Sequence, residues 1–161
     1  MNALAKLSTM GLLLLTGITG RSGQSEPVRF YLTIKVEKDS VRVGSIVNLQ
    51  VTITNRSSRT VSVHEGGVLE DWVLDVRGSD GTIVPDTGLA RKIKAATKGA
   101  HQRNFIARLK PGESREDTIE VSAFRDMSQP GEYKIRVQRQ LPPELGTGIV
   151  TSNTIVVTVT P

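Results

Sequence analysis

The stretch 47–55 places the tightest constraint on the fold, because its residues alternate between apolar and polar without a break. Its apolar positions are Val47, Leu49, Val51 and Ile53. Successive side chains of an extended chain point to opposite faces, so this pattern predicts a strand with one buried face and one solvated face. Such a strand needs partners beside it and a second layer over its apolar face.

Similar alternation recurs along most of the chain and predicts about eight strands. They are drawn from nine candidate segments, residues 30–36, 47–55, 60–63, 72–77, 82–84, 104–109, 117–121, 132–138 and 152–160, the last of them closing the domain. Polar turns separate these segments, and no amphipathic helix is expected after the N-terminal segment. The fold class that follows is an all-β, antiparallel β-sandwich of about seven to eight strands. A closed barrel would bury the same apolar stripes and stays open as an alternative.

The N-terminal segment reads differently from the rest. Lys6 is followed by the short apolar run 7–18 and then by small residues, which is typical of a secretory signal peptide over residues 1–22. A helix packed on the domain or an uncleaved anchor would be the alternatives. We expect a flexible leader at 23–27, a domain at 28–161, and a secreted or periplasmic protein with no stable membrane insertion after cleavage.

The amino-acid composition disfavours several kinds of functional site. The chain has no Cys and only His64 and His101, so thiolate sites are excluded and a histidine-based metal site or catalytic dyad has little material. The net charge of +5 would fall to +3 without Lys6 and Arg21, and the remaining cations are mostly interleaved with acids. We therefore expect no nucleic-acid partner, no cofactor, no metal and no catalytic residue.

Several turns resemble a known family. The segments 43–45 and 52–55, the turn Leu109–Glu113, and Pro130-Gly131-Glu132-Tyr133 are similar to bacterial immunoglobulin-like modules of exported proteins. That resemblance implies an immunoglobulin-like sandwich in which the Tyr133 hydroxyl reaches back to the chain, although Gln129 replaces the usual Asp. A weaker likeness, through the strand ending in Asn55 and the loop 78–81, is to the BsuPI-type proteinase-inhibitor domain.

The stretch 86–103 is the least regular part of the chain and carries a set of cations. They are Arg91, Lys92, Lys94, Lys98 and Arg103. We expect a long loop or a short helical turn. It is either a basic surface for an acidic protein or an acidic polysaccharide, or a solvated connection.

Other candidate sites are weaker. His64 beside Glu65 could act as an oriented base, and Glu70, Asp71 and Asp75 could hold a hard cation. We expect instead that His64 ends a solvated strand, that His101 lies in the basic stretch and that Ser114 belongs to a turn. Trp72, the only Trp, is expected in the core.

The sequence thus favours a non-enzymatic module that binds another macromolecule at the cell envelope or outside the cell. A BsuPI-like proteinase inhibitor is the alternative. A hydrolytic enzyme is disfavoured because nucleophile, base and orienting group do not occur together. The oligomeric state is not predicted.

Overall fold

The computed structural model describes residues 29–98, 105–141 and 148–161; the predicted signal peptide, leader and Arg103 lie outside these ranges. Its strands are β1 (Phe30–Val36), β2 (Ser40–Arg42), β3 (Asn48–Asn55), β4 (Val61–Glu65), β5 (Val73–Arg77), β6 (Phe105–Leu109), β7 (Ser114–Glu120), β8 (Gly131–Gln140), β9 (Ile149–Thr151) and β10 (Ile155–Thr160). Three helices are α1 (Val68–Asp71), α2 (Gly88–Thr97) and α3 (Val121–Phe124). The predicted all-β class is confirmed.

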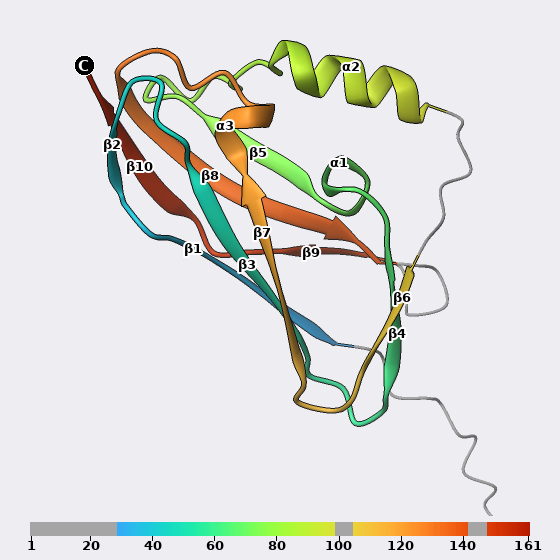
Figure 1. Ribbon diagram of the computed structural model, residues 1–161. Helices are drawn as coiled ribbons and strands as arrows, with labels where there is room; N and C mark the ends of the chain where they lie inside the picture. Colours follow the sequence, from blue (N-terminus) through green and yellow to red (C-terminus); the bar gives the residue numbers. More distant parts are fainter. Residues whose placement is uncertain (1–28, 99–104, 142–147) are drawn as a thin grey trace, which may run out of the picture.

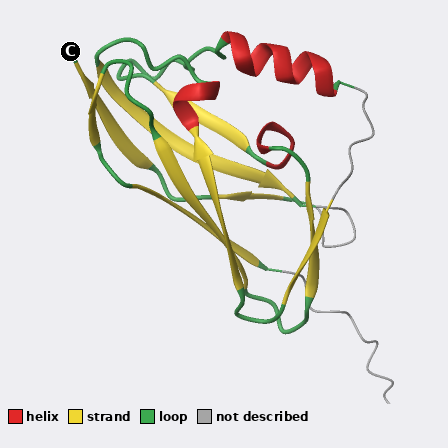
Figure 2. Ribbon diagram, viewed as in Figure 1, coloured by secondary structure: helices red, strands yellow, loops and turns green. Residues whose placement is uncertain are grey.

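The strands form two facing layers (Figures 1 and 2). One sheet has the order β1-β3-β7, the other has the order β2-β10-β8-β5 with β9 beside β8, and β4 pairs with β6. No ladder among the described strands joins β1-β3-β7 to β2-β10-β8-β5, so the described chain forms a sandwich-like pair of layers. The barrel alternative is not supported.

The core lies between these layers and is built from the alternating positions. Leu49, Ile119, Val76, Ile135 and Val157 have no exposed surface at all, and they come from both sheets. The core contains Trp72, as predicted, which is 3% exposed. Because aromatic residues are scarce, branched aliphatic side chains supply most of the apolar burial.

Three local predictions were wrong. The stretch 82–84 is no strand, since only an isolated bridge joins Ile83 to Arg77. Strand β7 ends at Glu120, and Val121 opens α3. Strand β2 pairs with β10 in parallel, although the other described ladders are antiparallel.

The expectation of no amphipathic helix was also wrong, because residues 88–97 form the helix α2. Thr87 caps its N-terminus by accepting a hydrogen bond from the Ala90 N–H at 3.1 Å. The segment that follows is rich in Ala, Lys, Arg and Leu, which favour helix. A single fully buried alanine gave too weak an apolar stripe to be recognised.

The predicted turns at the ends of the sandwich are confirmed. Gly112 has φ 78°, and the Glu113 N–H donates to the Lys110 carbonyl at 3.0 Å, which is the type II geometry. The Tyr133 hydroxyl donates to the Gln129 carbonyl at 2.7 Å. Because the acceptor is a backbone carbonyl, the corner forms without an Asp at position 129.

Buried Asn55 fixes the place where β3 turns into β4. Its Nδ2 donates to the carbonyls of Arg59 at 2.8 Å and Leu109 at 3.0 Å. Its Oδ1 accepts from the Ser57 N–H at 2.9 Å and from the Ser57 hydroxyl at 2.6 Å. One side chain therefore ties the β3–β4 turn to the end of β6.

Candidate functional site

Helix α2 carries Arg91, Lys92 and Lys94 of the basic set, Lys98 follows its last residue, and the helix lies outside the two layers (Figure 1). Ala90 is fully buried, and Ile93 and Thr97 are half-buried, so this face of α2 packs toward the domain. Residues three and seven positions apart lie on one side of a helix. The cations occupy the remaining surface, and α2 has no acidic residue of its own.

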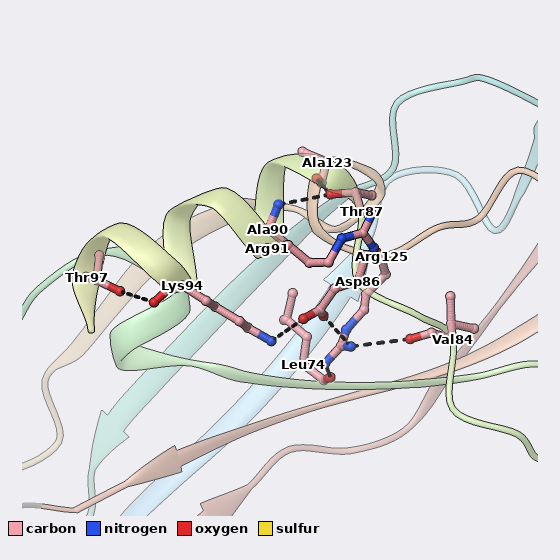
Figure 3. A network of polar contacts seen from close by, with 10 residues as sticks. All are labelled: Leu74, Val84, Asp86, Thr87, Ala90, Arg91, Lys94, Thr97, Ala123 and Arg125. Atoms are coloured by element: carbon pink, nitrogen blue, oxygen red, sulfur yellow. Dashed lines mark hydrogen bonds and ion pairs between the residues drawn. The ribbon is translucent and has the colours of Figure 1, made fainter. Parts of the chain in front are cut away.

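A network of polar contacts anchors the start of α2 (Figure 3). Asp86 forms ion pairs of 2.6 Å with Arg125 and with Lys94, and its backbone carbonyl accepts a hydrogen bond from Arg91. Thr87 adds a hydrogen bond from its hydroxyl to the Ala123 carbonyl at 2.5 Å. These contacts hold the helix to α3 and to the layers below.

The electrostatics of Asp86 follow from this arrangement. Burial works to raise the pKa of Asp86, but the hydrogen bond from Lys94 and the charges of Arg125, Lys94 and Arg91 outweigh it. The net result is a lowered pKa, so the carboxylate stays ionised and keeps its cations engaged.

Arg125 also has a structural role at the edge of a sheet. Its guanidinium donates to the Leu74 carbonyl at 2.5 Å and to the Val84 carbonyl at 3.3 Å (Figure 3). Leu74 lies on the edge strand β5, whose outer carbonyls would otherwise face solvent. The same network thus anchors α2 and covers β5.

The structure divides the predicted basic set. Arg91 and Lys94 turn toward Asp86, whereas Lys92 and Lys98 are exposed and have no ion-pair partner in the described chain. Arg103 lies outside the described residues. The expected long loop or short helical turn is therefore a ten-residue helix, and of the four described cations two contact Asp86 and two do not.

The weaker candidates are not brought together. Asp75 faces the outer side of β5, where it pairs with Arg136 at 2.6 Å and Arg77 at 3.0 Å. Asp71 instead accepts from the Gly66 N–H at 2.9 Å. Within the described ranges, no three His, Asp or Glu side chains gather as a metal site. Glu70, Asp71 and Asp75, which the sequence offered only as a weak candidate for a cation site, are therefore not brought together.

The remaining weak candidates are placed only in part. Ser114 opens β7, directly after the turn, and its hydroxyl lies 2.8 Å from that of Thr54. His64 belongs to β4, and His101 lies outside the described residues.

A pair of charged residues, buried Arg139 and half-buried Asp71, was not predicted from the sequence. Arg139 is 5% exposed, lies 4.7 Å from the centre of the Trp72 ring and pairs with Asp71 at 3.5 Å. Burial raises the pKa of Asp71, although Arg139 and the Gly66 N–H oppose it. The burial of Arg139 could have been predicted, because the alternation of Tyr133, Ile135 and Val137 places Arg139 on the same inward face of the strand.

Asp71 and Trp72 also line a cleft of about 140 Å³ with Arg115, Asp117 and Thr118 of β7. The strand pattern explains why charged side chains reach it, because Arg115 and Asp117 share the inward face of buried Ile119. The cleft therefore combines an indole wall with charges of both signs.

Comparison with known proteins finds similarity only among solved structures. No protein-family model matches the chain, and no curated protein matches it. Among solved structures, the chain is similar to a CARDB domain from Pyrococcus furiosus in complex with di-metal ions, with 18% identity, a TM-score of 0.45, and coverage of 84% of this chain and 90% of that chain. It is also similar to part of a β-glucosidase from Erythrobacter marinus, with 16% identity, a TM-score of 0.47, and coverage of 83% of this chain and 16% of that one. No helix in the described part is both long and apolar enough to cross a membrane.

Proposed function

We propose that this chain is a non-enzymatic, exported β-sandwich module of immunoglobulin-like type that binds an acidic macromolecule at the cell envelope or outside the cell. The single observation that carries the proposal is the fixed geometry of α2. Asp86 and Arg125 hold the helix on the sandwich, while Lys92 and Lys98 stay exposed.

A fixed helix suits an acidic partner for a physical reason. Its cations are presented on a backbone that is already ordered, so less conformational entropy is lost on binding than for a mobile loop. Lysine side chains in solvent attract negative surfaces and increase association rates at low salt. The partner classes that fit are an acidic polysaccharide and an acidic protein surface.

The immunoglobulin-like part of the proposal has separate support. The Tyr133 hydroxyl bond to the Gln129 carbonyl has the form of the tyrosine corner of that fold. The strand begins with Gly131, directly before Glu132 and Tyr133, as in the resemblance drawn from the sequence.

Charge reversal on α2 tests the proposal. The variant Lys92→Glu/Lys98→Glu is compared with Lys38→Glu/Lys110→Glu, which makes the same charge change at exposed turns elsewhere. Elution from immobilised heparin, a model acidic polysaccharide, is measured over a salt gradient, with binding to an acidic protein such as a poly-glutamate conjugate as the second arm. We expect the α2 variant to elute at clearly lower salt than the control in at least one arm. If the two variants elute at equal salt in both arms, α2 is not the binding surface for an acidic partner.

A further inference from the structure

Three of the edge strands have protected or very short edges. On β1, the Asn153 side chain accepts from the Ile34 N–H at 2.8 Å and donates to the Ile34 carbonyl at 3.1 Å. On β5, Arg125 covers the Leu74 carbonyl, and the Val84 N–H donates to the Val76 carbonyl at 2.9 Å. Strand β2 has only three residues. Covering and shortening are the usual ways in which proteins block unwanted strand addition.

The outer edge of β7 is different. At the ends of its ladder with β3, the Asn55 N–H donates to the Glu113 carbonyl at 3.0 Å and the Val121 N–H donates to the Val47 carbonyl at 2.8 Å. Bonded and non-bonded pairs alternate along an antiparallel ladder. The odd-numbered residues of β7 therefore bond to β3, and Glu116 and Thr118 turn their N–H and C=O groups away from it.

These backbone groups of Glu116 and Thr118 have no hydrogen-bond partner in the described part of the chain. In Figure 1, β7 lies with β3 on one side and no strand of its own sheet on the other. An edge with unpaired, regularly spaced donors and acceptors is a template for an added strand.

The side chains around this edge define what could bind. On the outer face, Glu116 and Glu120 are exposed and lie four positions apart in the strand. On the inner face, Arg115 and Asp117 border the cleft that contains Asp71 and Trp72. An added strand would meet acidic groups outside and charges of both signs inside.

We propose that the free edge of β7 binds an extended segment of a partner protein as an additional strand. Basic side chains of that segment would lie opposite Glu116 and Glu120, because opposite charges on neighbouring strands stabilise their pairing. Its inward side chains would be small or polar, since they enter the mixed-charge cleft beside Arg115 and Asp117. The backbone of Glu116 and Thr118 supplies the affinity, and the alternate side chains supply the selectivity.

The same residues disfavour other occupants. A second copy that paired its β7 with this β7 would bring Glu116 and Glu120 close to their own equivalents, and like charges on adjacent strands repel. An apolar strand would have to bury side chains against Arg115 and Asp117, and inward charges of this kind oppose aggregation. The edge therefore selects a polar, basic strand, and this surface is independent of α2.

The test uses the full chain and a synthetic peptide of alternating sequence, with lysines four positions apart on one face and Thr or Ser on the other. Amide signals are followed by NMR and hydrogen exchange. We expect the amides of Glu116 and Thr118 to exchange quickly in the free protein and to become protected with the peptide. The neighbouring Asp117 amide, which bonds to β3, is expected to be protected in both states.

Two variants make the test decisive. Thr118→Pro removes an N–H that the β3–β7 ladder does not use and should weaken the peptide at least about tenfold, whereas Thr118→Val keeps the N–H and should bind as before. Glu116→Lys/Glu120→Lys should weaken the lysine peptide and strengthen a matched glutamate peptide. The α2 variant Lys92→Glu/Lys98→Glu should bind like the natural chain.

Three outcomes would overturn the proposal. The peptide could bind without protecting Glu116 and Thr118. Charge reversal at Glu116 and Glu120 could leave the preference for lysine unchanged. Sedimentation could show a dimer of this chain that Thr118→Pro abolishes, which would assign the edge to a second copy.

Discussion

Removing the side chain of Asn55 should destabilise the domain far more than most single substitutions. Asn55→Ala deletes four hydrogen bonds and leaves the Leu109 carbonyl and the Ser57 N–H inside the protein without the partner that Asn55 supplies, while the Ser57 hydroxyl can still donate to the Arg59 carbonyl at 3.2 Å. Each bond contributes about 1 kcal/mol, and a stranded buried group costs about 1–3 kcal/mol. Since water will replace Asn55 as the partner of some of these groups, we expect the free energy of unfolding to fall by about 3–5 kcal/mol.

Urea unfolding monitored by the fluorescence of the single, buried Trp72 measures this loss. Ser57→Ala removes the hydroxyl that donates to the Asn55 side chain at 2.6 Å and to the Arg59 carbonyl at 3.2 Å, and it should cost about 1 kcal/mol. In a double-mutant cycle, the two substitutions should be less than additive by about 1 kcal/mol, because they delete the same bond. A loss below about 1 kcal/mol for Asn55→Ala, or full additivity, would refute the assignment of Asn55 as the tie at this corner.

The other predictions concern the corner tyrosine and two carboxylates. Tyr133→Phe deletes the bond to the Gln129 carbonyl and should lower the free energy of unfolding by about 1 kcal/mol with an unchanged denaturant slope. The pKa of Asp86 is lowered because the Lys94 bond and nearby charges outweigh burial, so its contribution is present above its ordinary value of 3.8 and is lost as the pH falls through the lower folded pKa. Asp86→Asn should flatten that loss in urea titrations at acidic pH. Burial raises the pKa of Asp71, so its contribution is full below 3.8 and declines as the pH rises through the folded pKa, and Asp71→Asn should abolish this decline. A pH dependence unchanged from the natural chain would contradict either assignment.

The sequence predicted the strands that have a strict local pattern. In β1, β3, β8 and β10, burial alternates residue by residue, so a short window contains the whole signal. The turn at Gly112 and the corner at Tyr133 were predictable for the same reason, because a few adjacent residues determine each geometry.

What the sequence could not supply depends on residues far apart in the chain. The parallel pairing of β2 with β10 joins Val41 to Val159, and no local pattern signals it. The engagement of Lys94 and the open edge at Thr118 both follow from which strand ends up beside which. Helix α2 was missed because its packing face is narrow and its anchor, Arg125, comes from another segment.

Export, removal of a signal peptide over residues 1–22 and the macromolecular partner remain predictions, as does the BsuPI-type alternative. The N-terminal sequence of the secreted protein would test the first two. Incubation with a panel of secreted proteases would test the inhibitor alternative. If micromolar protein inhibits none of them, that alternative is wrong.

The position of β10 has a consequence for how the chain acquires its structure. The last strand described, Ile155–Thr160, lies in the middle of its sheet, between β2 from the start of the domain and β8. During synthesis from the N-terminus, this layer cannot close until β10 has emerged, so earlier segments wait with their apolar faces uncovered. The order in which this layer forms is therefore set by one contact between segments far apart in the sequence, the pairing of Val41 with Val159.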